Sequence, residues 1–228
     1  MQFEITKESI QEIQQLIAEN NNNALLNLLS EVHHADIAEI IEEIEIDEAI
    51  FLIKLLESDV TSEVIAELDE DTREKVLRGL SSKEIAEEID ELDTDDAADI
   101  ISELSEQQKK EVISHLEDEE HAKEIVELLR YDEDTAGGLM AKELVKVNEN
   151  WNVLTCVKEM RAQAEDVSRV HSIYVVDDND ILKGRLSLKD LLTTSTRTAI
   201  KDVFIKQVDS VNVNDDAEDV AKIMQKYD

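Results

Sequence analysis

The sequence has no proline, four glycines and one cysteine in 228 residues. The single cysteine, Cys156, excludes an internal disulfide and fits a reducing compartment. No apolar run approaches the ~18 residues that are needed to span a bilayer, and no secretory signal opens the chain. These absences predict a soluble cytoplasmic polypeptide.

Basic residues are scarce: Lys and Arg number 23 against 57 Asp and Glu, for a net charge of -34. Residues 1–130 hold 10 basic and 38 acidic residues, a net charge of -28, whereas residues 131–228 carry only -6. So acidic a surface repels phosphate backbones and anionic headgroups, which argues against nucleic acid or a lipid surface as a partner of the first part. Cations are the partners that it favours, although a charge excess also serves solubility alone.

Signals of an enzyme are also lacking. The sequence shows no nucleophile–base pair, no phosphate-binding glycine loop and no zinc-ligand spacing. Four histidines have neither a cysteine partner nor the tight spacing of a zinc site, and we interpret them as surface or interface residues: His33, His34, His115 and His121. An enzyme is therefore the least favoured class.

A twelve-residue repeat organises the first part of the chain. Apolar spacing predicts a helix over residues 6–20 and a second helix through Leu25, Leu26, Leu28 and Leu29. From there an aliphatic residue recurs every twelve positions, and another stands three positions before each: Ile44, Leu56, Leu68, Leu80, Leu92, Leu104, Leu116 and Leu128, preceded by Ile41, Ile53, Ile65, Leu77, Ile89, Ile101, Ile113 and Ile125. Each unit is predicted to be a helix of about two turns with a tight connection.

Aspartates two or three residues after many of these positions are the predicted helix caps: Asp47, Asp59, Asp71, Asp95 and Asp118. Isolated helices below ~12 residues are marginal in water, so these helices must stack. Stacked pairs of units predict an α-solenoid or superhelix with an acidic exterior. A protein-interaction scaffold is one function that such an array serves.

The densest acidic cluster of the array is Asp93-Thr-Asp-Asp-Ala-Ala-Asp99. Asp95 and Asp99 are four residues apart on one helix face, where like charges cost ~0.2 to 0.5 kcal/mol unless something neutralises them. A divalent cation would do so. The alternative is that Thr94 or Asp95 caps the helix and Asp96 complements its dipole. Asp99 lies beyond the cap, so this alternative explains it less well.

Two of the four glycines, Gly137 and Gly138, stand together in the stretch Tyr131-Asp-Glu-Asp-Thr-Ala-Gly-Gly-Leu-Met140. Glycine tolerates positive φ and permits close approach of a backbone or a ligand. The pair therefore predicts an irregular segment that acts as a hinge between two kinds of structure. A helix C-terminus with a glycine stop is the simpler interpretation, and both stay open here.

After the hinge the pattern predicts an α/β domain. Strands are expected at residues 144–147, 172–176 and 181–186, the last two joined as a hairpin. One helix is expected from about Ser187, and another over residues 151–163 with four apolar side chains inward: Val153, Leu154, Val157 and Met160. A second copy begins with residues 209–213 and a helix over residues 216–227, and the sequence stops inside it.

This order of elements, with Ile173-Tyr-Val-Val-Asp177 and Gly184-Arg-Leu-Ser-Leu-Lys-Asp190, resembles a CBS domain, one member of a CBS pair. Joined to the hinge and to the upstream His34-Ala-Asp-Ile-Ala-Glu-Ile40 and Asp95-Asp-Ala-Ala-Asp99, it resembles the cytosolic half of the MgtE magnesium transporters, over essentially the whole chain. The resemblance implies four segments: an acidic helical N domain at residues 1–130, a Gly-Gly hinge at 131–143, a first CBS domain at 144–207 and the start of a second at 208–228.

The resemblance implies a sensor on the cytoplasmic side of the cell membrane. In the family, cytosolic Mg2+ binds between acidic faces of the N and CBS domains, closes them together and shuts a transmembrane pore that works as a dimer. The expected partners are that pore domain and, through the CBS domains, a second copy of the chain. Since the rest of the second CBS domain, the connecting helix and the pore are not in this sequence, we expect no transport by the chain itself. The positions that match the ligands are Glu63, Asp95, Asp99, the backbone carbonyl of Gly137, Glu218 and Asp228.

Nucleotide sensing is the rival function. CBS pairs commonly bind adenosine ligands such as ATP, and Ser187-Leu-Lys-Asp190 fits the ribose-contacting Ser/Thr-x-x-Asp pattern of such domains. Ser187 and Asp190 also suit a helix cap, so the pattern alone leaves both roles open.

Overall fold

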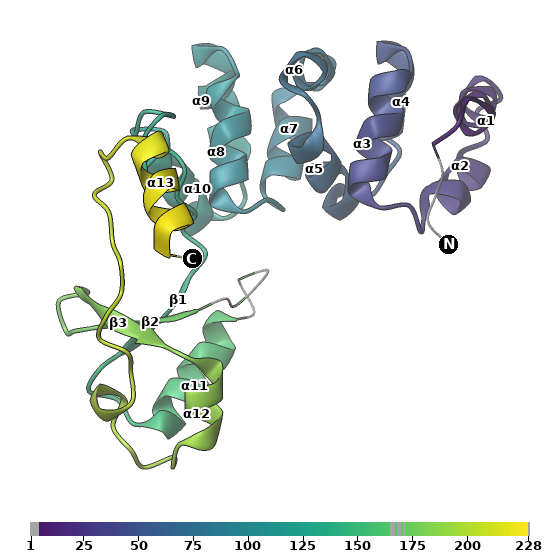
Figure 1. Ribbon diagram of the computed structural model, residues 1–228. Coiled ribbons are helices and arrows are strands. Elements are labelled where there is room, and N and C mark those ends of the chain that lie inside the picture. Colours follow the sequence, from purple (N-terminus) through teal and green to yellow (C-terminus); the bar gives the residue numbers. More distant parts are fainter. Residues whose placement is uncertain (1–4, 165–166, 168–169, 171, 228) are drawn as a thin grey trace. The chain divides into compact units, whose positions relative to one another are not determined.

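The structure, a computed structural model, describes residues 5–164, 167, 170 and 172–227. The chain divides into two compact units, Met1–Leu129 and Arg130–Asp228. The first is built of helices and the second combines helices with a small sheet (Figure 1). The predicted order, an α-helical region followed by an α/β region, is confirmed. In the described part of the chain, no helix has the length and hydropathy that crossing a membrane requires.

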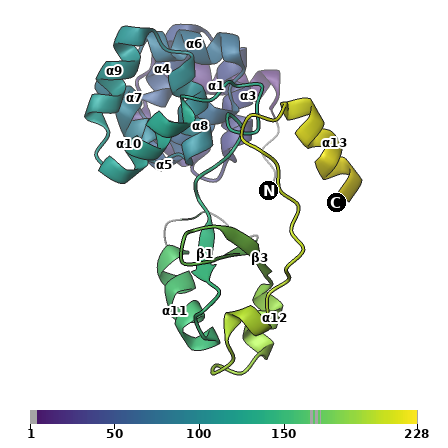
Figure 2. The ribbon, with the colours of Figure 1, turned by 90° about the vertical axis from the view of Figure 1, so that its left-hand side faces the viewer.

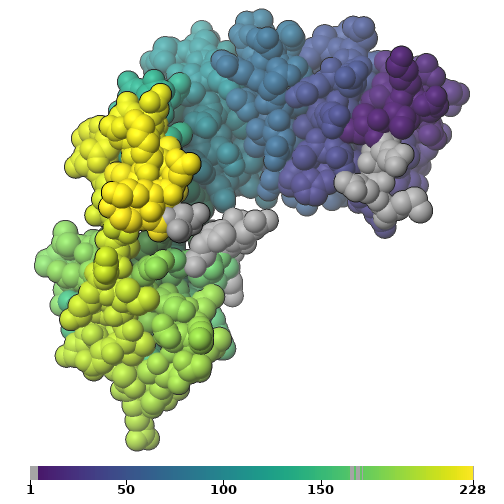
Figure 3. Space-filling model, viewed as in Figure 1, coloured from purple at the N-terminus to yellow at the C-terminus, as the bar shows by residue number. Residues whose placement is uncertain are grey.

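Short helices follow one another through the first unit, and their side chains pack into a continuous body (Figure 3). Most have eight to ten residues, as the twelve-residue period predicts. Their bounds are α1 Lys7–Ala18, α2 Asn22–Leu29, α3 His34–Glu43, α4 Ile46–Ile53, α5 Ser58–Glu67, α6 Glu70–Arg78, α7 Ser82–Ile89, α8 Thr94–Ser102, α9 Glu106–His115 and α10 Glu119–Leu128.

In most units the N-cap residue, which immediately precedes the helix, comes directly after the repeated aliphatic position. Asp69 follows Leu68, and its carboxylate accepts a hydrogen bond from the amide of Thr72 at 2.9 Å. Ser81 and Ser105 take the same place before α7 and α9, and their hydroxyl oxygens accept from the amide three residues on. A side-chain acceptor at this position satisfies a helical N–H that has no partner within the helix. The period therefore fixes where each helix starts.

Four of the five predicted caps are wrong. The helices begin two residues earlier than predicted, so these aspartates lie in the first turn, where they complement the helix dipole: Asp47, Asp59, Asp71 and Asp95. The cap position of α8 is held by Asp93, and not by Thr94 or Asp95. Asp118 is confirmed as a cap, because its Oδ1 accepts from the amides of Glu120 at 2.7 Å and His121 at 3.1 Å.

Alternate helices pack side by side, because two repeats return the chain to the same layer. Thus α5 packs against α3 and α7, α7 against α9, α4 against α6, and α8 against α10. Polar side chains thirty residues apart join these neighbours, as in the bond from Ser58 Oγ of α5 to Glu88 Oε2 of α7 at 3.0 Å. The predicted stacking is confirmed.

The apolar position three residues before each repeated leucine is the centre of the core. Seven of the eight predicted residues are at most 2 % exposed: Ile41, Ile53, Ile65, Leu77, Ile89, Ile101 and Ile125. Ile113 is only partly buried, and its neighbour Val112 is fully buried in its place. Burial of these aliphatic side chains supplies the stability that each short helix lacks alone.

The second unit contains a three-stranded sheet in the order β1-β2-β3. β1 (Val145–Asn148) pairs with β2 (Ile173–Val176) in parallel, and β2 pairs with β3 (Leu182–Leu186) as the predicted antiparallel hairpin. The helices α11 (Val153–Gln163) and α12 (Leu188–Thr193) lie on one side of the sheet (Figure 2). The 3-10 helix η1 (Ile200–Asp202) and the helix α13 (Ala217–Tyr227) follow.

Cys156 and Val153 of α11 are buried against the sheet, with Val157 and Met160 packed around that core. Leu154, which was expected to face inward, is 63 % exposed, because it lies one position off the stripe that Val153 and Cys156 define. Burial raises the pKa of the Cys156 thiol to about 11, so this cysteine is a packing residue.

The Gly-Gly stretch is a backbone junction and not a helix stop. α10 ends at Leu128, well before the glycines, and neither glycine has a positive φ. The amide of Gly137 donates to the carbonyl of Val213 at 2.8 Å. A Cβ on Gly138 would lie 2.4 Å from the carbonyl oxygen of Asp132, so close backbone approach is what requires glycine here. The expected strand at residues 209–213 does not form, because the chain there pairs with the junction instead.

Candidate functional site

Three predicted metal ligands belong to one acidic face of the first unit. Asp95 and Asp99 lie on α8, and Glu63 lies on α5. Their effect is visible on Asp96, whose pKa is raised to about 6 by partial burial and then by the charges of Asp95, Asp93, Asp99 and Glu63. A carboxyl group in the first turn of a helix is normally favoured as an anion. The surrounding negative charge and the burial therefore outweigh the helix dipole at this face.

His34 connects the same face to α3. Its Nδ1 lies 3.9 Å from Oε2 of Glu63, and its Nε2 lies 4.0 Å from Oε1 of Glu67, one turn further along α5. The interpretation of His34 as an interface residue fits this position between two helices. A protonated imidazole would offset part of the negative charge beside Glu63.

Gly137 and Glu218, predicted as ligands from the second half, lie in one region of the second unit. The junction runs antiparallel to the segment before α13, with an isolated bridge between Thr135 and Asp216. Asp216 Oδ1 accepts from the amide of Glu218 at 2.9 Å, which begins the helix. The Glu218 carboxylate itself is exposed, 4.0 Å from the ammonium group of Lys222. An exposed carboxylate at a helix start is accessible to a cation.

Asp228 lies outside the described residues. Within the described ranges, no group of three or more His, Cys, Asp or Glu side chains is arranged as a ligand set for one ion. A cation held at either acidic group would therefore keep waters as its remaining ligands, which is the usual condition of Mg2+ in proteins.

Ser187 is the N-cap residue of α12, which is the helix-cap role that the sequence predicts beside the nucleotide contact. Its Oγ accepts a hydrogen bond from the amide of Lys189 at 3.2 Å, and Asp190 lies in the first turn. The cap role of Ser187 is confirmed. The nucleotide contact of Ser187 and Asp190 stays a prediction.

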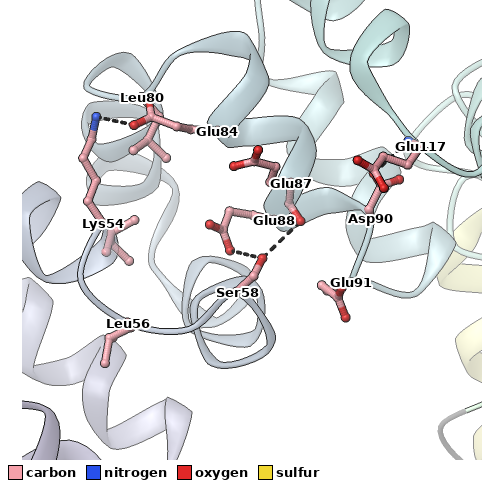
Figure 4. A pocket seen from close by; sticks show the side chains of 11 residues that line it. Lys54, Leu56, Ser58, Leu80, Glu84, Glu87, Glu88, Asp90, Glu91 and Glu117 are labelled. Atoms are coloured by element: carbon pink, nitrogen blue, oxygen red, sulfur yellow. Dashed lines mark hydrogen bonds and ion pairs between the residues drawn. The ribbon is translucent and has the colours of Figure 1, made fainter.

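A cavity of about 480 Å³ in the first unit was not predicted from the sequence. It lies beside α5 and α7, and Figure 4 shows its side chains. Six carboxylates line it: Glu84, Glu87, Glu88, Asp90, Glu91 and Glu117. Among the described residues of the lining, Lys54 is the one basic residue, and it is bonded to Glu84.

The carboxyl group of Glu88, which lines this cavity, has a strongly raised pKa. Burial, opposed by a hydrogen bond from Ser58 and reinforced by neighbouring carboxylates, raises its pKa to about 7. Ser58 of α5 donates a hydrogen bond to Glu88 of α7 at 3.0 Å, between two helices that pack against each other.

Family comparison divides the chain in a similar way to the structure. Residues 32–134 match the MgtE intracellular N domain, and residues 136–196 match the CBS domain. A magnesium transporter MgtE from Thermus thermophilus is 41% identical over 105 residues, and the one from Enterococcus faecalis is 39% identical over the same length. Each match covers 46% of this chain but only 23% of the transporter.

Two solved structures resemble the whole chain. The crystal structure of the cytosolic domain of the Mg2+ channel MgtE in complex with ATP is 30% identical, with a TM-score of 0.87 over 96% of this chain and 89% of that one. The crystal structure of the soluble part of a magnesium transporter is 28% identical, with a TM-score of 0.80 over 97% and 87% of the two chains. The chain therefore belongs to the MgtE family of magnesium transporters, of which it contains the N domain and a CBS domain.

Proposed function

We propose that this chain is the Mg2+-sensing regulatory region of a magnesium transporter or channel, on the cytoplasmic side of the membrane. The observation that carries the proposal is the gathering of Glu63, Asp95 and Asp99 on one face, where their charges act together on Asp96. The relatives named above are magnesium transporters, which supports Mg2+ as the ion.

Mg2+ suits these residues chemically. It is a hard cation that takes oxygen ligands at ~2.1 Å, keeps several waters, and is often held by only one or two protein carboxylates. A few carboxylates on each of two surfaces are then sufficient. Glu63, Asp95 and Asp99 supply the first surface, and the Gly137 carbonyl, Glu218 and Asp228 supply the second.

The mechanism follows from repulsion and its relief. Without the ion, two acidic surfaces repel each other, so the N domain and the CBS region stay apart. With the ion they share ligands and dock, so the Mg2+ concentration sets the population of the docked state. In the full-length protein the docked state closes the transmembrane pore. The partners are that pore domain and a second copy of the chain bound through the CBS domains.

Isothermal titration with Mg2+ tests this function on the chain itself. The variant carrying Glu63→Gln, Asp95→Asn and Asp99→Asn should lose most of the Mg2+ heat. A control carrying Asp47→Asn, Asp71→Asn and Glu119→Gln removes the same charge from other helices and should keep it. An equal loss of Mg2+ binding heat in both variants would show that Mg2+ is attracted by the overall negative charge and not by a site.

A second candidate function is binding of an adenosine nucleotide. It is favoured by the ATP complex of the related cytosolic domain and by the position of Ser187 and Asp190 directly after β3. Titration with ATP, with and without Mg2+, checks it. Asp190→Asn should weaken ATP binding without removing the Ser187 cap, and unchanged ATP affinity in this variant would exclude Asp190 as a contact.

A further inference from the structure

The aromatic ring of Tyr131 lies against the backbone of Gly137 within the second unit. A Cβ on Gly137 would lie 2.5 Å from Cδ1 and 2.6 Å from Cγ of that ring, and 2.9 Å from the carbonyl oxygen of Val213. Gly137 is buried. The ring and the Val213 carbonyl therefore occupy the space that a side chain would need, and they leave the Gly137 backbone no room to move towards either of them.

Hydrogen bonds hold the peptide groups on both sides of Gly137. Before it, the amide of Gly137 donates to the carbonyl oxygen of Val213 at 2.8 Å. After it, the amide of Gly138 donates to the carbonyl oxygen of Thr135 at 3.1 Å. The two peptide planes that meet at Gly137 are therefore both fixed.

The carbonyl group of Gly137 consequently has a fixed direction. A peptide group is planar and trans, so this C=O points opposite to the N–H of Gly138. Since that N–H is turned towards Thr135, the Gly137 carbonyl points away from Thr135. No residue in the described part of the chain donates a hydrogen bond to this oxygen. Buried backbone carbonyls are nearly always paired with protein, water or another ligand, so this oxygen fits the role of a cation ligand.

The same junction holds Glu218, the other described ligand that was predicted in this unit. The amide of Ala217 donates to the carbonyl oxygen of Asp134 at 2.9 Å, and the amide of Glu218 donates to Asp216 Oδ1 at 2.9 Å. Gly137 and Glu218 thus share one hydrogen-bonded frame. The first offers a carbonyl of fixed direction, and the second offers an exposed side chain.

A ligand of fixed direction suits Mg2+ better than it suits Ca2+. Mg2+ demands near-ideal octahedral geometry, whereas Ca2+ accepts ~6 to 8 oxygen ligands in flexible arrangements. An oxygen that is already held in place loses little freedom when it joins an octahedral site. Loosening that oxygen should therefore weaken the binding of Mg2+ more than the binding of Ca2+.

We infer that Tyr131 is a positioning residue of the proposed Mg2+ site: its ring holds the Gly137 carbonyl in one direction and thereby makes the site favour Mg2+ over Ca2+. The inference rests on the proposed function, in which Gly137 supplies its carbonyl oxygen to Mg2+. Tyr131 acts through Gly137 and is not itself a ligand.

Calorimetric titration of the 228-residue chain with Mg2+, and separately with Ca2+, at constant ionic strength tests the inference. Tyr131→Ala should weaken Mg2+ binding about tenfold, as the loss of a residue that orients a metal ligand commonly does. The same variant should weaken Ca2+ binding much less. Tyr131→Phe keeps the ring and should bind both ions like the unsubstituted chain. Tyr174→Ala, which removes the same kind of ring from β2, is the matched control and should also bind both ions normally.

Amide hydrogen exchange without divalent ions tests the positioning independently of metal binding. The amides of Gly137 and Gly138 should exchange faster in Tyr131→Ala than in Tyr174→Ala, because loss of the packed ring loosens their bonds to Val213 and Thr135. Equal exchange of these amides in the two variants would overturn the inference.

Two titration results would also overturn it. One is an Mg2+ affinity that Tyr131→Ala leaves unchanged, and the other is an equal loss of Mg2+ and Ca2+ binding in that variant. Either result would refute the inference alone. Absence of Mg2+ binding by the unsubstituted chain would instead refute the proposed function, together with the inference that rests on it.

Discussion

The guanidinium group of Arg73 on α6 is paired with the carboxylate of Glu103, the residue that ends α8. Nε of Arg73 lies 3.0 Å from Oε1 and 3.2 Å from Oε2 of Glu103, and Nη2 also bonds Oε1. Nη1 donates to the backbone carbonyls of Ala66 and Leu68. Both side chains are 16 % exposed, so this is a largely desolvated pair in a strongly acidic unit.

Removing one member of this pair should be costly. Glu103→Gln leaves a guanidinium group without its counter-charge in a site with little water, and should lower the free energy of unfolding by about 3 kcal/mol. Arg78→Ala removes the exposed pair with Glu74 and should cost at most about 0.5 kcal/mol. Urea denaturation of both variants gives the comparison. Similar costs would show that desolvation at Arg73 is unimportant.

The cap assignments make a sharp prediction for two aspartates. Asp118→Ala removes an acceptor from two backbone amides and should cost ~0.5 to 2 kcal/mol. Asp47→Ala changes a first-turn residue that is not the cap of α4, and should cost less than Asp118→Ala. Thermal melting without divalent ions measures both. Equal losses would contradict the cap positions in the structure.

Close backbone contact at the junction predicts the effect of a single methyl group. In Gly138→Ala the new Cβ would meet backbone atoms of Asp132 and Glu133, which cannot turn away. The cost should be about 1 to 3 kcal/mol. Gly79→Ala meets the end of the Ile50 side chain, which can change rotamer, and should cost less. Thermal melting of both variants measures these costs. An unchanged melting temperature in Gly138→Ala would contradict the junction geometry.

The Asp96 carboxyl group should make stability depend on pH. Its pKa is raised from 3.8 to about 6, so the folded state holds extra protons between these values and stability falls as the pH rises through them. Asp96→Asn should therefore stabilise the chain at pH 7.5 and have little effect near pH 3.5. Melting at the two pH values checks this, and a gain of equal size at both would assign the effect to packing and not to charge.

The sequence predicts the repeated fold well because burial follows a fixed period. Ile53, Ile65 and Ile89 recur in one register, and any stacking that hides one of them hides the others. Cap positions are predicted less well, since Asp93 and Asp95 are chemically equivalent and only the backbone shows which of them precedes the helix. The prediction that Leu154 faces inward is wrong for a similar reason, because a shift of one position on a helix turns a side chain by about 100° around the helix axis.

The candidate site is predicted only in part. Glu63 of α5 and Asp99 of α8 both raise the pKa of Asp96, and no local sequence pattern reveals this relation between distant helices. Glu88 looks like any surface glutamate in the sequence, and its pKa is raised by burial in the stacked array and by neighbouring carboxylates. Burial between helices is a property of the stacked array, so it appears only once the array is built.

The central claim is tested most directly by small-angle scattering of the chain during titration with Mg2+ at constant ionic strength. Sodium chloride is the control, because screening alone relieves repulsion in a chain of charge -34. The radius of gyration should fall as Mg2+ is added, and Asp99→Asn should require more Mg2+ for the same decrease, while Asp71→Asn should behave like the unsubstituted chain. A radius of gyration that Mg2+ leaves unchanged, or an unaltered response in Asp99→Asn, would contradict Mg2+-dependent docking through this residue.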